Sequence, residues 1–281
     1  MIAICPNPFR DSELKYTRQA AEMLHAAGYE TAVCPVFAED VPQMIPEDIK
    51  ATTLDAVRSR CSLVVVIGGD GTILSAARQL HNADIPILGV NLGSKGFMAA
   101  LEPEHMQLIV KAAAGEYTVS RRMMLDIELE RGGEIIYRDK ALNDVVLHGY
   151  GDCIRLTAWC AGDRITSFSG DGIILSTPTG STGYSMSAGG PIVEPEASAI
   201  IVSPICAHMM SARSYVLSAS HDVSVLAEKL HGRRAYISVD GNSAMDLTNG
   251  DLLRVRRSER CILMADMGLK SFFDLAFEKL T

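Results

Sequence analysis

One short stretch constrains this chain more than any other. An apolar, mostly β-branched run at residues 63–67 leads directly into Gly68-Gly69-Asp70-Gly71-Thr72. The run has the composition of a buried strand in a parallel sheet. The glycines end that strand and leave backbone N–H groups bare at its carboxyl end, where open α/β sheets bind ligands. Thr72 is the expected N-cap of a helix over 73–80, so a helix N-terminus points at the same place. The stretch therefore predicts an anion site, with phosphate as the expected ligand.

Asp70 is the unusual member of this loop, because a carboxylate repels a phosphate unless it binds a metal or takes a proton from a nucleophile. In the alternative interpretation the loop is a plain strand-to-helix turn and Asp70 only caps the helix, since short motifs also occur by chance. The chain has neither a Walker A pattern nor a GxGxxG fingerprint, which disfavours an ordinary dinucleotide-binding Rossmann domain. We therefore expect a phosphate loop of another kind, with Asp70 as its candidate catalytic residue.

The chain divides into two regions with different patterns. Strand and helix patterns alternate over residues 1–100, which predicts an α/β domain with a parallel sheet and helices on both faces. From about residue 120 the pattern becomes β-rich, and we expect a β-sandwich-like C-terminal domain. The final segment, Phe272–Leu280, resembles an amphipathic helix that packs back on the first domain. We assign 1–100 with 262–281 to the α/β domain, and 101–261 to the β-rich domain.

The expected elements are as follows. The first region should have strands at 2–5, 31–36, 63–67 and 85–90, and helices at 11–27, 54–60 and 73–80, with Gly28 ending the first helix. The second should have strands that include 125–130, 145–148, 155–160, 172–176 and 234–239.

Composition excludes several classes of function. The formal net charge of -8 argues against an obligate nucleic-acid binder, although local groups can still attract a small anion. The seven cysteines form no CxxC pair and the histidines show no metal-ligand spacing, so we expect reduced thiols and no zinc site. No apolar run approaches membrane-spanning length, and the first strand is too short for a signal-peptide core. We expect a cytoplasmic protein without membrane or nucleic-acid partners.

A second polar segment runs from Asp171 to Gly190 and is dense in hydroxyls and glycine. Such composition is often that of a flexible linker. Here it follows a β-branched strand and contains Tyr184, whose ring offers a flat apolar face. A folded site is the better interpretation, with hydroxyls and amides for ribose or phosphate and a ring for a base.

Two further polar stretches are ambiguous. Asn143-Asp144 precedes an apolar strand, where such residues usually form turns, although they also suit a ribose diol or an adenine edge. Asp240-Gly241-Asn242 follows another strand, and a hairpin turn is its default interpretation.

Together these segments resemble the NAD kinase family. Residues 68–72 match its GGDGT signature, and Gly89–Gly93 with Gly96-Phe97 resembles its next strand and loop. Asn143-Asp144 stands where the family has Asn followed by an acid, and the run from Asp171 to Gly190 is close to its longest motif. Lipid kinases and, more distantly, phosphofructokinases share GGDGT, so the long run makes the resemblance specific.

The resemblance implies a function and a set of roles. The protein would transfer phosphate from ATP, or another phosphoryl donor, to the adenosine 2′-hydroxyl of NAD, with a divalent metal such as Mg²⁺ and with Asp70 as base, metal ligand or aligner. It would act as a homodimer or homotetramer. The implied substrate-binding residues are Gly68, Gly69, Gly71, Thr72, Phe97, Asn143, Asp144, Asp171, Thr182, Gly183, Tyr184, Ser187 and Asn242.

The chain departs from the family motifs at three site positions, and two other functions are compatible with GGDGT. Asp144 replaces the family's common Glu, Gly183 its Ala and Asn242 its Gln, which affects pocket detail and the choice between NAD and NADH. A GGDGT-type lipid kinase is disfavoured because the chain is acidic and has no basic amphipathic helix. A non-catalytic dinucleotide sensor is disfavoured because it would not need Asp70.

Overall fold

The computed structural model describes residues 1–37, 42–80, 83–93, 96–209, 212–228 and 230–280. The chain forms two compact units, Met1–Arg121 with Ile262–Thr281 and Arg122–Cys261. The first contains a parallel sheet and the second antiparallel strands, which confirms the expected fold class. Residues 101–121 group with the first unit, because the helix α4 (Leu108–Ala113) contributes Ile109 and Ala112 to the core of that unit.

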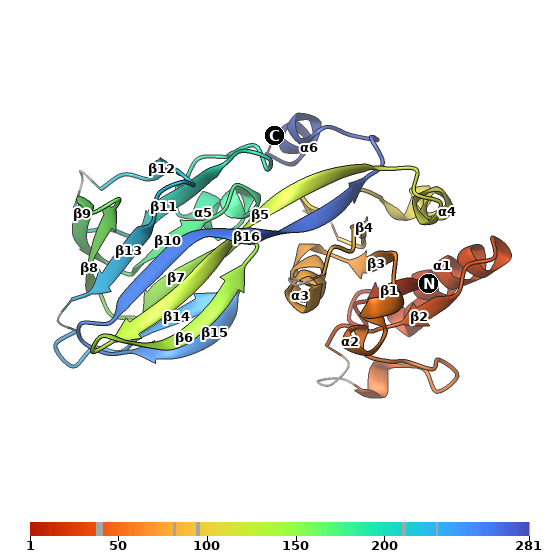
Figure 1. Ribbon diagram of the computed structural model, residues 1–281, viewed down its shortest axis with the longest axis horizontal. Helices are drawn as coiled ribbons and strands as arrows, with labels where there is room; N and C mark the ends of the chain where they lie inside the picture. Colours follow the sequence, from red (N-terminus) through yellow and green to blue (C-terminus); the bar gives the residue numbers. More distant parts are fainter. Residues whose placement is uncertain (38–41, 81–82, 94–95, 210–211, 229, 281) are drawn as a thin grey trace. The chain divides into compact units, whose positions relative to one another are not determined.

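The first unit is built on parallel strands in the order β2-β1-β3-β4 (Figure 1). These strands are β1 (Ile2–Pro6), β2 (Thr31–Val33), β3 (Leu63–Gly68) and β4 (Ile87–Asn91). β3 is buried along its whole length, as expected for an apolar strand between two layers of helices. Because β1, β3 and β4 run in the same direction, their carboxyl ends share one edge of the sheet.

Helices cover both faces of this sheet (Figure 1). α1 (Lys15–Ala26) and α4 pack on one face, where Leu24 and Ile109 join Val65 in one apolar cluster. α3 (Asp70–Leu80) packs on β3 and β4 with Ile73 and Leu80 fully buried. The remaining helical segments of this unit are α2 (Leu54–Val57), α6 (Phe272–Leu280) and the 3₁₀ turns Ser12–Leu14, Pro42–Met44, Arg58–Arg60 and Pro103–His105.

Several predicted boundaries are wrong for local reasons. The helix expected at 11–27 begins only at Lys15, because Glu13 and Leu14 have φ of 52° and cannot belong to a right-handed helix. The strand expected at 31–36 ends at Val33, and the helix expected at 54–60 is an α turn followed by a 3₁₀ turn. Gly28, by contrast, follows α1 with φ of 84° and donates its N–H to the His25 carbonyl at 2.9 Å, as expected of a helix-ending glycine.

The second unit contains two groups of strands. The six-stranded antiparallel sheet has the order β12-β11-β10-β7-β14-β15. Its strands are β7 (Asp144–Gly149), β10 (Gly172–Ser176), β11 (Ala199–Ile205), β12 (Tyr215–Ser218), β14 (Ala235–Val239) and β15 (Asn242–Leu247). The other group is β5 (Thr118–Arg131), β6 (Glu134–Ala141), β8 (Ile154–Cys160), β9 (Asp163–Gly170), β13 (Val223–Ala227) and β16 (Leu252–Asp266), of which β5 and β16 begin or end in the first unit.

A shared apolar core joins these two groups of strands. Leu125, Leu156 and Val223 from one group and Leu147 and Ile173 from the other belong to one cluster of buried side chains. Alternate residues of each strand face this cluster, which explains the β-like alternation of the sequence. The six-stranded sheet carries the predicted polar segment, which folds after β10 into a 3₁₀ turn (Thr179–Thr182) and the short helix α5 (Tyr184–Ser187).

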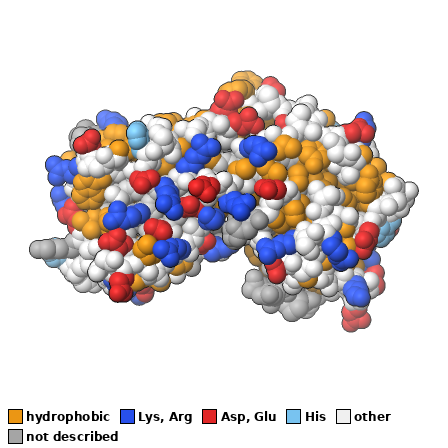
Figure 2. Space-filling model, viewed as in Figure 1, with side chains coloured by type: hydrophobic (Ala, Val, Ile, Leu, Met, Phe, Trp, Pro, Cys, Tyr) orange, Lys and Arg blue, Asp and Glu red, His pale blue; other side chains and the backbone are white. Residues whose placement is uncertain are grey.

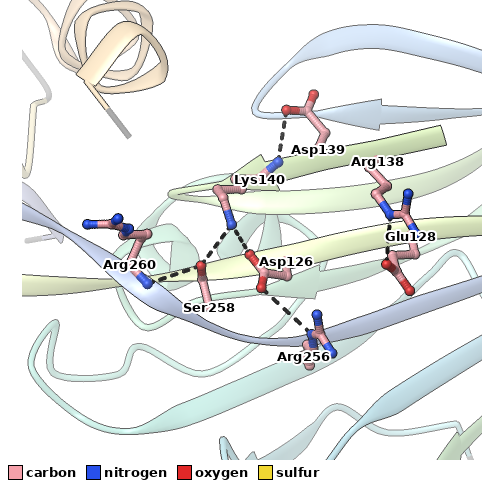
Figure 3. Close-up of polar contacts among 8 residues, drawn as sticks. All are labelled: Asp126, Glu128, Arg138, Asp139, Lys140, Arg256, Ser258 and Arg260. Carbon is pink, nitrogen blue, oxygen red and sulfur yellow. Dashed lines mark hydrogen bonds and ion pairs between the residues drawn. The ribbon is translucent and has the colours of Figure 1, made fainter. Parts of the chain in front are cut away.

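The outer face of β5, β6 and β16 carries a row of ion pairs (Figure 3). Lys140 bonds Asp126 and the Ser258 hydroxyl, and Arg138 bonds Glu128 at 2.9 Å. In Figure 2, acidic and basic side chains alternate over these strands. Pairs of this kind keep a broad sheet face soluble but contribute little to stability.

Within the described part of the chain, no helix has both the length and the apolar character needed to span a membrane.

Asp11 is a buried carboxylate that holds the start of α1. It is 1% exposed and accepts hydrogen bonds from the backbone N–H of Tyr16 at 2.9 Å and of Thr17 at 3.0 Å. The Thr17 hydroxyl donates a third bond at 2.7 Å. The carboxylate thus satisfies first-turn donors that have no partner inside the helix.

We predict that Asp11→Ala lowers the free energy of unfolding by about 2–3 kcal/mol, because buried donors lose a charged acceptor. The matched control is Asp48→Ala, which removes an exposed carboxylate paired with Arg18 at 2.6 Å and should have a much smaller effect, because solvent screens exposed ion pairs. Urea denaturation measures both changes. Equal effects of the two substitutions would contradict the role given to Asp11.

Candidate active site

The carboxyl ends of β1, β3 and β4 form the first candidate site. Asn7 follows β1 and ties it to β3, because its backbone N–H donates to the Ile67 carbonyl at 2.9 Å. Leu92 follows β4 and donates to the Gly68 carbonyl at 2.8 Å. The loops at this edge are therefore held to one another by backbone bonds, at the place where α/β sheets bind ligands.

Thr72 supports the glycine loop from inside. Its side chain is 1% exposed, and its hydroxyl accepts bonds from the Asn7 amide at 3.1 Å and from the Gly69 N–H at 3.3 Å. α3 begins at Asp70, so the prediction that Thr72 is the N-cap is wrong; the backbone carbonyl of Gly69 accepts the first helical bonds instead. A Cβ on Gly68 would lie 2.4 Å from the Thr72 hydroxyl, which requires glycine there. Gly71 has no heavy atom within 4 Å of that position and faces open space.

The Asp70 carboxylate holds the loop that follows β4. One oxygen accepts the backbone N–H of Phe97 at 2.7 Å and the other accepts that of Met98 at 3.2 Å. A Cβ on Gly96 would lie 2.7 Å from Asp70 Oδ1, so the backbone approaches the carboxylate closely. Burial raises the pKa of Asp70, and the two amides and Lys279 oppose that rise.

Lys279 of α6 is a neighbour of this carboxylate that the sequence did not indicate. Its ammonium donates to the Gly96 carbonyl and lies 5.7 Å from the centroid of the Phe97 ring. A lysine near the end of an amphipathic helix has no pattern that separates it from a solvated charge. α6 was expected to pack on the first domain, and this contact is within the first unit.

In the second unit, Asp240 fixes the loop that carries Asn143-Asp144. Its carboxylate accepts the backbone N–H groups of Leu142 at 2.8 Å, Asn143 at 2.7 Å and Asp144 at 3.0 Å. The Asp240 N–H donates in return to the Asp144 carbonyl at 2.9 Å. The expected hairpin turn is confirmed between β14 and β15, with Gly241 at φ of 80°, but the turn also has this second task.

Asp144 is a buried carboxyl group, only 6% exposed. Burial and the nearby charge of Asp240 raise its pKa to about 7. Near neutral pH the group is therefore shared between the protonated form, which donates a hydrogen bond, and the ionised form, which only accepts.

Two buried polar atoms next to this loop have no partner among the described residues: Asn143 Oδ1 and Thr179 Oγ1. Asn143 is held against the turn after β10, since a Cβ on Gly180 would lie 2.2 Å from its carbonyl oxygen. Buried polar atoms are nearly always hydrogen-bonded, so unpartnered ones mark a place for a ligand. Thr179 lies in the predicted polar segment, but nothing in the sequence separated it from its neighbouring hydroxyls.

A row of stacked rings borders the same loop. The Tyr184 ring stacks on His148 at 5.5 Å, and His148 stacks on Tyr236 at 5.4 Å. Burial lowers the pKa of His148, which favours a neutral imidazole in this row. Tyr184 ends the row and is 40% exposed, so one face of its ring remains available for a flat ligand.

The remaining predicted residues differ in their exposure and in their distance from Asn143. A Cβ on Gly183 would lie 3.6 Å from the Asn143 amide nitrogen, and the Thr182 hydroxyl bonds the Thr179 carbonyl at 3.3 Å. Ser187 and Asn242 are exposed, and Asp171 raises the pKa of the Cys206 thiol beside it. Gly68 to Thr72 and Phe97 lie in the first unit, whereas Asn143, Asp144, Asp171, Thr182, Gly183, Tyr184, Ser187 and Asn242 lie in the second.

No group of three or more His, Cys, Asp or Glu side chains in the described ranges lies close enough to hold a metal ion. The carboxylate oxygens of Asp70 face backbone amides. The described residues around Asp70 therefore do not form a complete set of metal ligands. They are compatible with a cation that is held mainly by the phosphates of a bound nucleotide.

Comparison with known proteins places both halves of the chain in one family. Residues 2–117 match the ATP-NAD kinase N-terminal domain, and residues 120–266 match the ATP-NAD kinase C-terminal domain. The chain is 36% identical over 277 residues to the NAD kinase of Acetivibrio thermocellus, covering 98% of this chain and 94% of that protein. It is 39% identical to the NAD kinase of Geobacter metallireducens, with 81% of each covered.

Solved structures show the same fold. A yeast NADH kinase crystallised with NADH superposes with a TM-score of 0.83 at 26% identity, covering 99% of this chain and 86% of that one. An NAD kinase from Archaeoglobus fulgidus crystallised with ATP gives a TM-score of 0.75 at 24% identity, covering 100% and 98%.

Asp144 predicts a specific pH dependence of stability. Its folded pKa of about 7 lies above the ~3.9 of a free aspartate, so between these values the folded chain retains a proton that the unfolded chain has lost. Stability therefore falls as pH rises through this window. Above the window, the ionised Asp144 has lowered the free energy of unfolding by up to roughly 4 kcal/mol.

We predict that Asp144→Asn flattens the loss of stability between pH 5 and pH 8, because an amide does not titrate. Denaturation curves at fixed ionic strength measure the slope. Asp48→Asn, at an exposed carboxylate, should leave the slope unchanged in this range. Identical slopes for the wild type and Asp144→Asn would show that Asp144 does not titrate with the raised pKa.

Proposed function

The chain belongs to the NAD kinase family and phosphorylates NAD with ATP to give NADP, and from this premise we propose how its residues divide the work. The lipid-kinase and sensor alternatives are set aside because both halves of the chain match the kinase family. One observation supports the division most strongly: the second unit has buried, unpartnered polar atoms beside a stack of rings, whereas the first has a carboxylate within a glycine-rich edge.

The second unit binds the dinucleotide. Asn143 Oδ1 and Thr179 Oγ1 lack partners, and a ribose hydroxyl or an amide group of NAD satisfies them. The partly protonated carboxyl group of Asp144 adds a donor or an acceptor next to them. The NADH bound to the yeast NADH kinase supports a nicotinamide dinucleotide as the ligand.

The exposed face of Tyr184 stacks on a base of the dinucleotide. Gly183 and Thr182 form the wall beside Asn143, and Ser187, Asp171 and Asn242 supply polar contacts at the exposed margin. The assignments of Thr182 and Gly183 follow from their positions beside Asn143 and Thr179, and those of Ser187, Asp171 and Asn242 follow from the family resemblance.

The first unit binds the phosphoryl donor. Gly71 brings its backbone N–H to the carboxyl edge of the sheet, where the N-terminus of α3 favours an anion. Gly69, whose N–H bonds the Thr72 hydroxyl, adds no side chain at that edge. Thr72 and Phe97 act indirectly, Thr72 through its hydroxyl and Phe97 through its N–H on Asp70. The ATP bound to the archaeal NAD kinase accords with ATP as the donor. Mg²⁺ would accompany ATP, held mainly by phosphate oxygens, and would neutralise charge as the phosphoryl group moves.

Asp70 aligns the acceptor and takes its proton. The ribose 2′-oxygen attacks the γ-phosphorus, the bond to the β-phosphate oxygen breaks, and the hydroxyl proton passes to Asp70. Each carboxylate oxygen uses one lone pair on an amide and keeps another for the substrate. The burial that raises the Asp70 pKa makes the group a better base than a free aspartate.

We also propose that the protein is cytoplasmic and acts as a homodimer or homotetramer. The family resemblance supports assembly, and exposed apolar side chains such as Val216, 55% exposed, and Phe273, 64% exposed, offer contact area.

We predict that Asp70→Asn lowers turnover by roughly 10²–10⁴-fold while NAD binding persists, because the amide cannot accept the proton. The assay supplies ATP, Mg²⁺ and NAD or NADH and detects NADP(H) with an NADP-specific dehydrogenase, and calorimetry measures NAD binding. Asp48→Asn is the control. Near-normal turnover of Asp70→Asn would remove Asp70 from the mechanism, and no product from the wild type would overturn the kinase assignment.

We predict that Thr179→Val weakens NAD binding by about 3- to 10-fold without loss of stability, because its hydroxyl has no hydrogen-bond partner to lose among the residues that the structure describes. The control is Thr177→Val. That hydroxyl donates to the Leu142 carbonyl at 2.6 Å and accepts the Gly180 N–H at 3.0 Å, so its loss should destabilise the fold by about 1–3 kcal/mol. Unchanged NAD affinity in Thr179→Val would show that NAD does not contact Thr179.

A further inference from the structure

We infer that Arg10 is the side chain that binds the terminal phosphates of the donor. This inference rests on the function proposed above and adds a residue that neither the GGDGT motif nor the predicted site contains. Three observations carry it: the rigid turn that holds Arg10, the position of its guanidinium against two glycines, and the charge of the surrounding loop.

The turn after β1 is tied down on both sides of Arg10. Before it, Asn7 bonds the Ile67 carbonyl through its backbone and the Thr72 hydroxyl through its side-chain amide, at 2.9 and 3.1 Å. After it, the buried Asp11 bonds the first turn of α1. The Arg10 N–H itself donates to the Asn7 carbonyl at 3.0 Å. The backbone of Arg10 is thus fixed to the same residues that shape the glycine loop.

The guanidinium lies against the glycines at the carboxyl edge of the sheet. A Cβ on Gly93, after β4, would lie 2.7 Å from Arg10 Nη1, and a Cβ on Gly69, after β3, would lie 3.7 Å from Arg10 Cζ. At Gly93 a side chain would collide with the guanidinium in this position, whereas at Gly69 a Cβ would be in ordinary contact with it. The cation therefore lies beside both loops that border the predicted phosphate site, while the residue remains exposed to solvent.

The charge of the site calls for such a cation. A triphosphate brings several negative charges to a loop that already contains Asp70, in a chain of formal net charge -8. Lys279 uses one of its three N–H donors on the Gly96 carbonyl. Arg10 forms no ion pair with any residue that the structure describes, so its donors are available. A guanidinium suits phosphate because it donates two parallel hydrogen bonds with full charge.

The test measures how the effect of an Arg10 substitution depends on the number of phosphates in the donor nucleotide. With ATP varied at saturating NAD, Arg10→Gln should lower kcat/KM for ATP by about 10- to 100-fold, and Arg10→Lys should recover part of the loss. Calorimetry without NAD should show a loss of affinity that is largest for Mg-ATP, smaller for ADP and smallest for AMP. The affinity for NAD should stay within about 2-fold of the wild type. Melting temperatures show that each variant is folded.

Arg18→Ala is the matched control, because Arg18 is an exposed arginine of α1 paired with Asp48. It should leave all these values unchanged. The inference fails if Arg10→Gln retains the wild-type kcat/KM for ATP. It also fails if affinities for ATP, AMP and NAD fall equally, since that result indicates a structural role. A wild type that makes no NADP(H) would instead overturn the proposed function.

Discussion

Hydrogen bonds from backbone amides to a single carboxylate fix the candidate site in each unit. Asp70 accepts the N–H groups of Phe97 and Met98, and Asp240 accepts those of three consecutive residues from Leu142. Such bonds are stronger than neutral ones because the acceptor is charged. They hold irregular loops in one conformation, which is the main requirement of phosphoryl transfer, a reaction that depends on positioning and charge.

Each candidate site also contains a buried carboxyl group with a raised pKa. Burial raises the pKa of Asp70, and burial together with the charge of Asp240 raises that of Asp144 to about 7. Groups with shifted pKa values gather at functional sites because catalysis needs donors and acceptors near neutral pH. Burying an ionisable carboxyl group lowers the stability of the fold, and the hydrogen bonds to Asp240 compensate by holding the Asp144 loop in place.

Local charge matters more here than the net charge of the chain. The formal charge of -8 makes an extended nucleic-acid surface unfavourable, yet Arg10 and Lys279 both lie by the glycine-rich edge of the first unit. Two glycines leave room for charged groups at this edge: Gly93 admits the Arg10 guanidinium, and Gly96 admits the Asp70 carboxylate. The acidic composition and the binding of an anionic substrate are therefore compatible.

The sequence by itself determined the fold class, the strand β3 with its glycine loop, the strand β10 and the helix α6, because periodicity and glycine act over a few neighbouring residues. It also determined the family through residues 68–72 and 171–190. Only the tertiary structure decided that Thr72 supports the loop instead of capping α3, and that Asp240 holds the loop of Asn143. It also decided that the Thr179 hydroxyl has no partner among the described residues and that Arg10 lies against Gly93. The contacts involved join residues far apart in sequence, such as Asn7 with Thr72 or Asp240 with Leu142. No local pattern encodes such pairs, since they form only when separate segments of the chain meet at the same edge of a sheet.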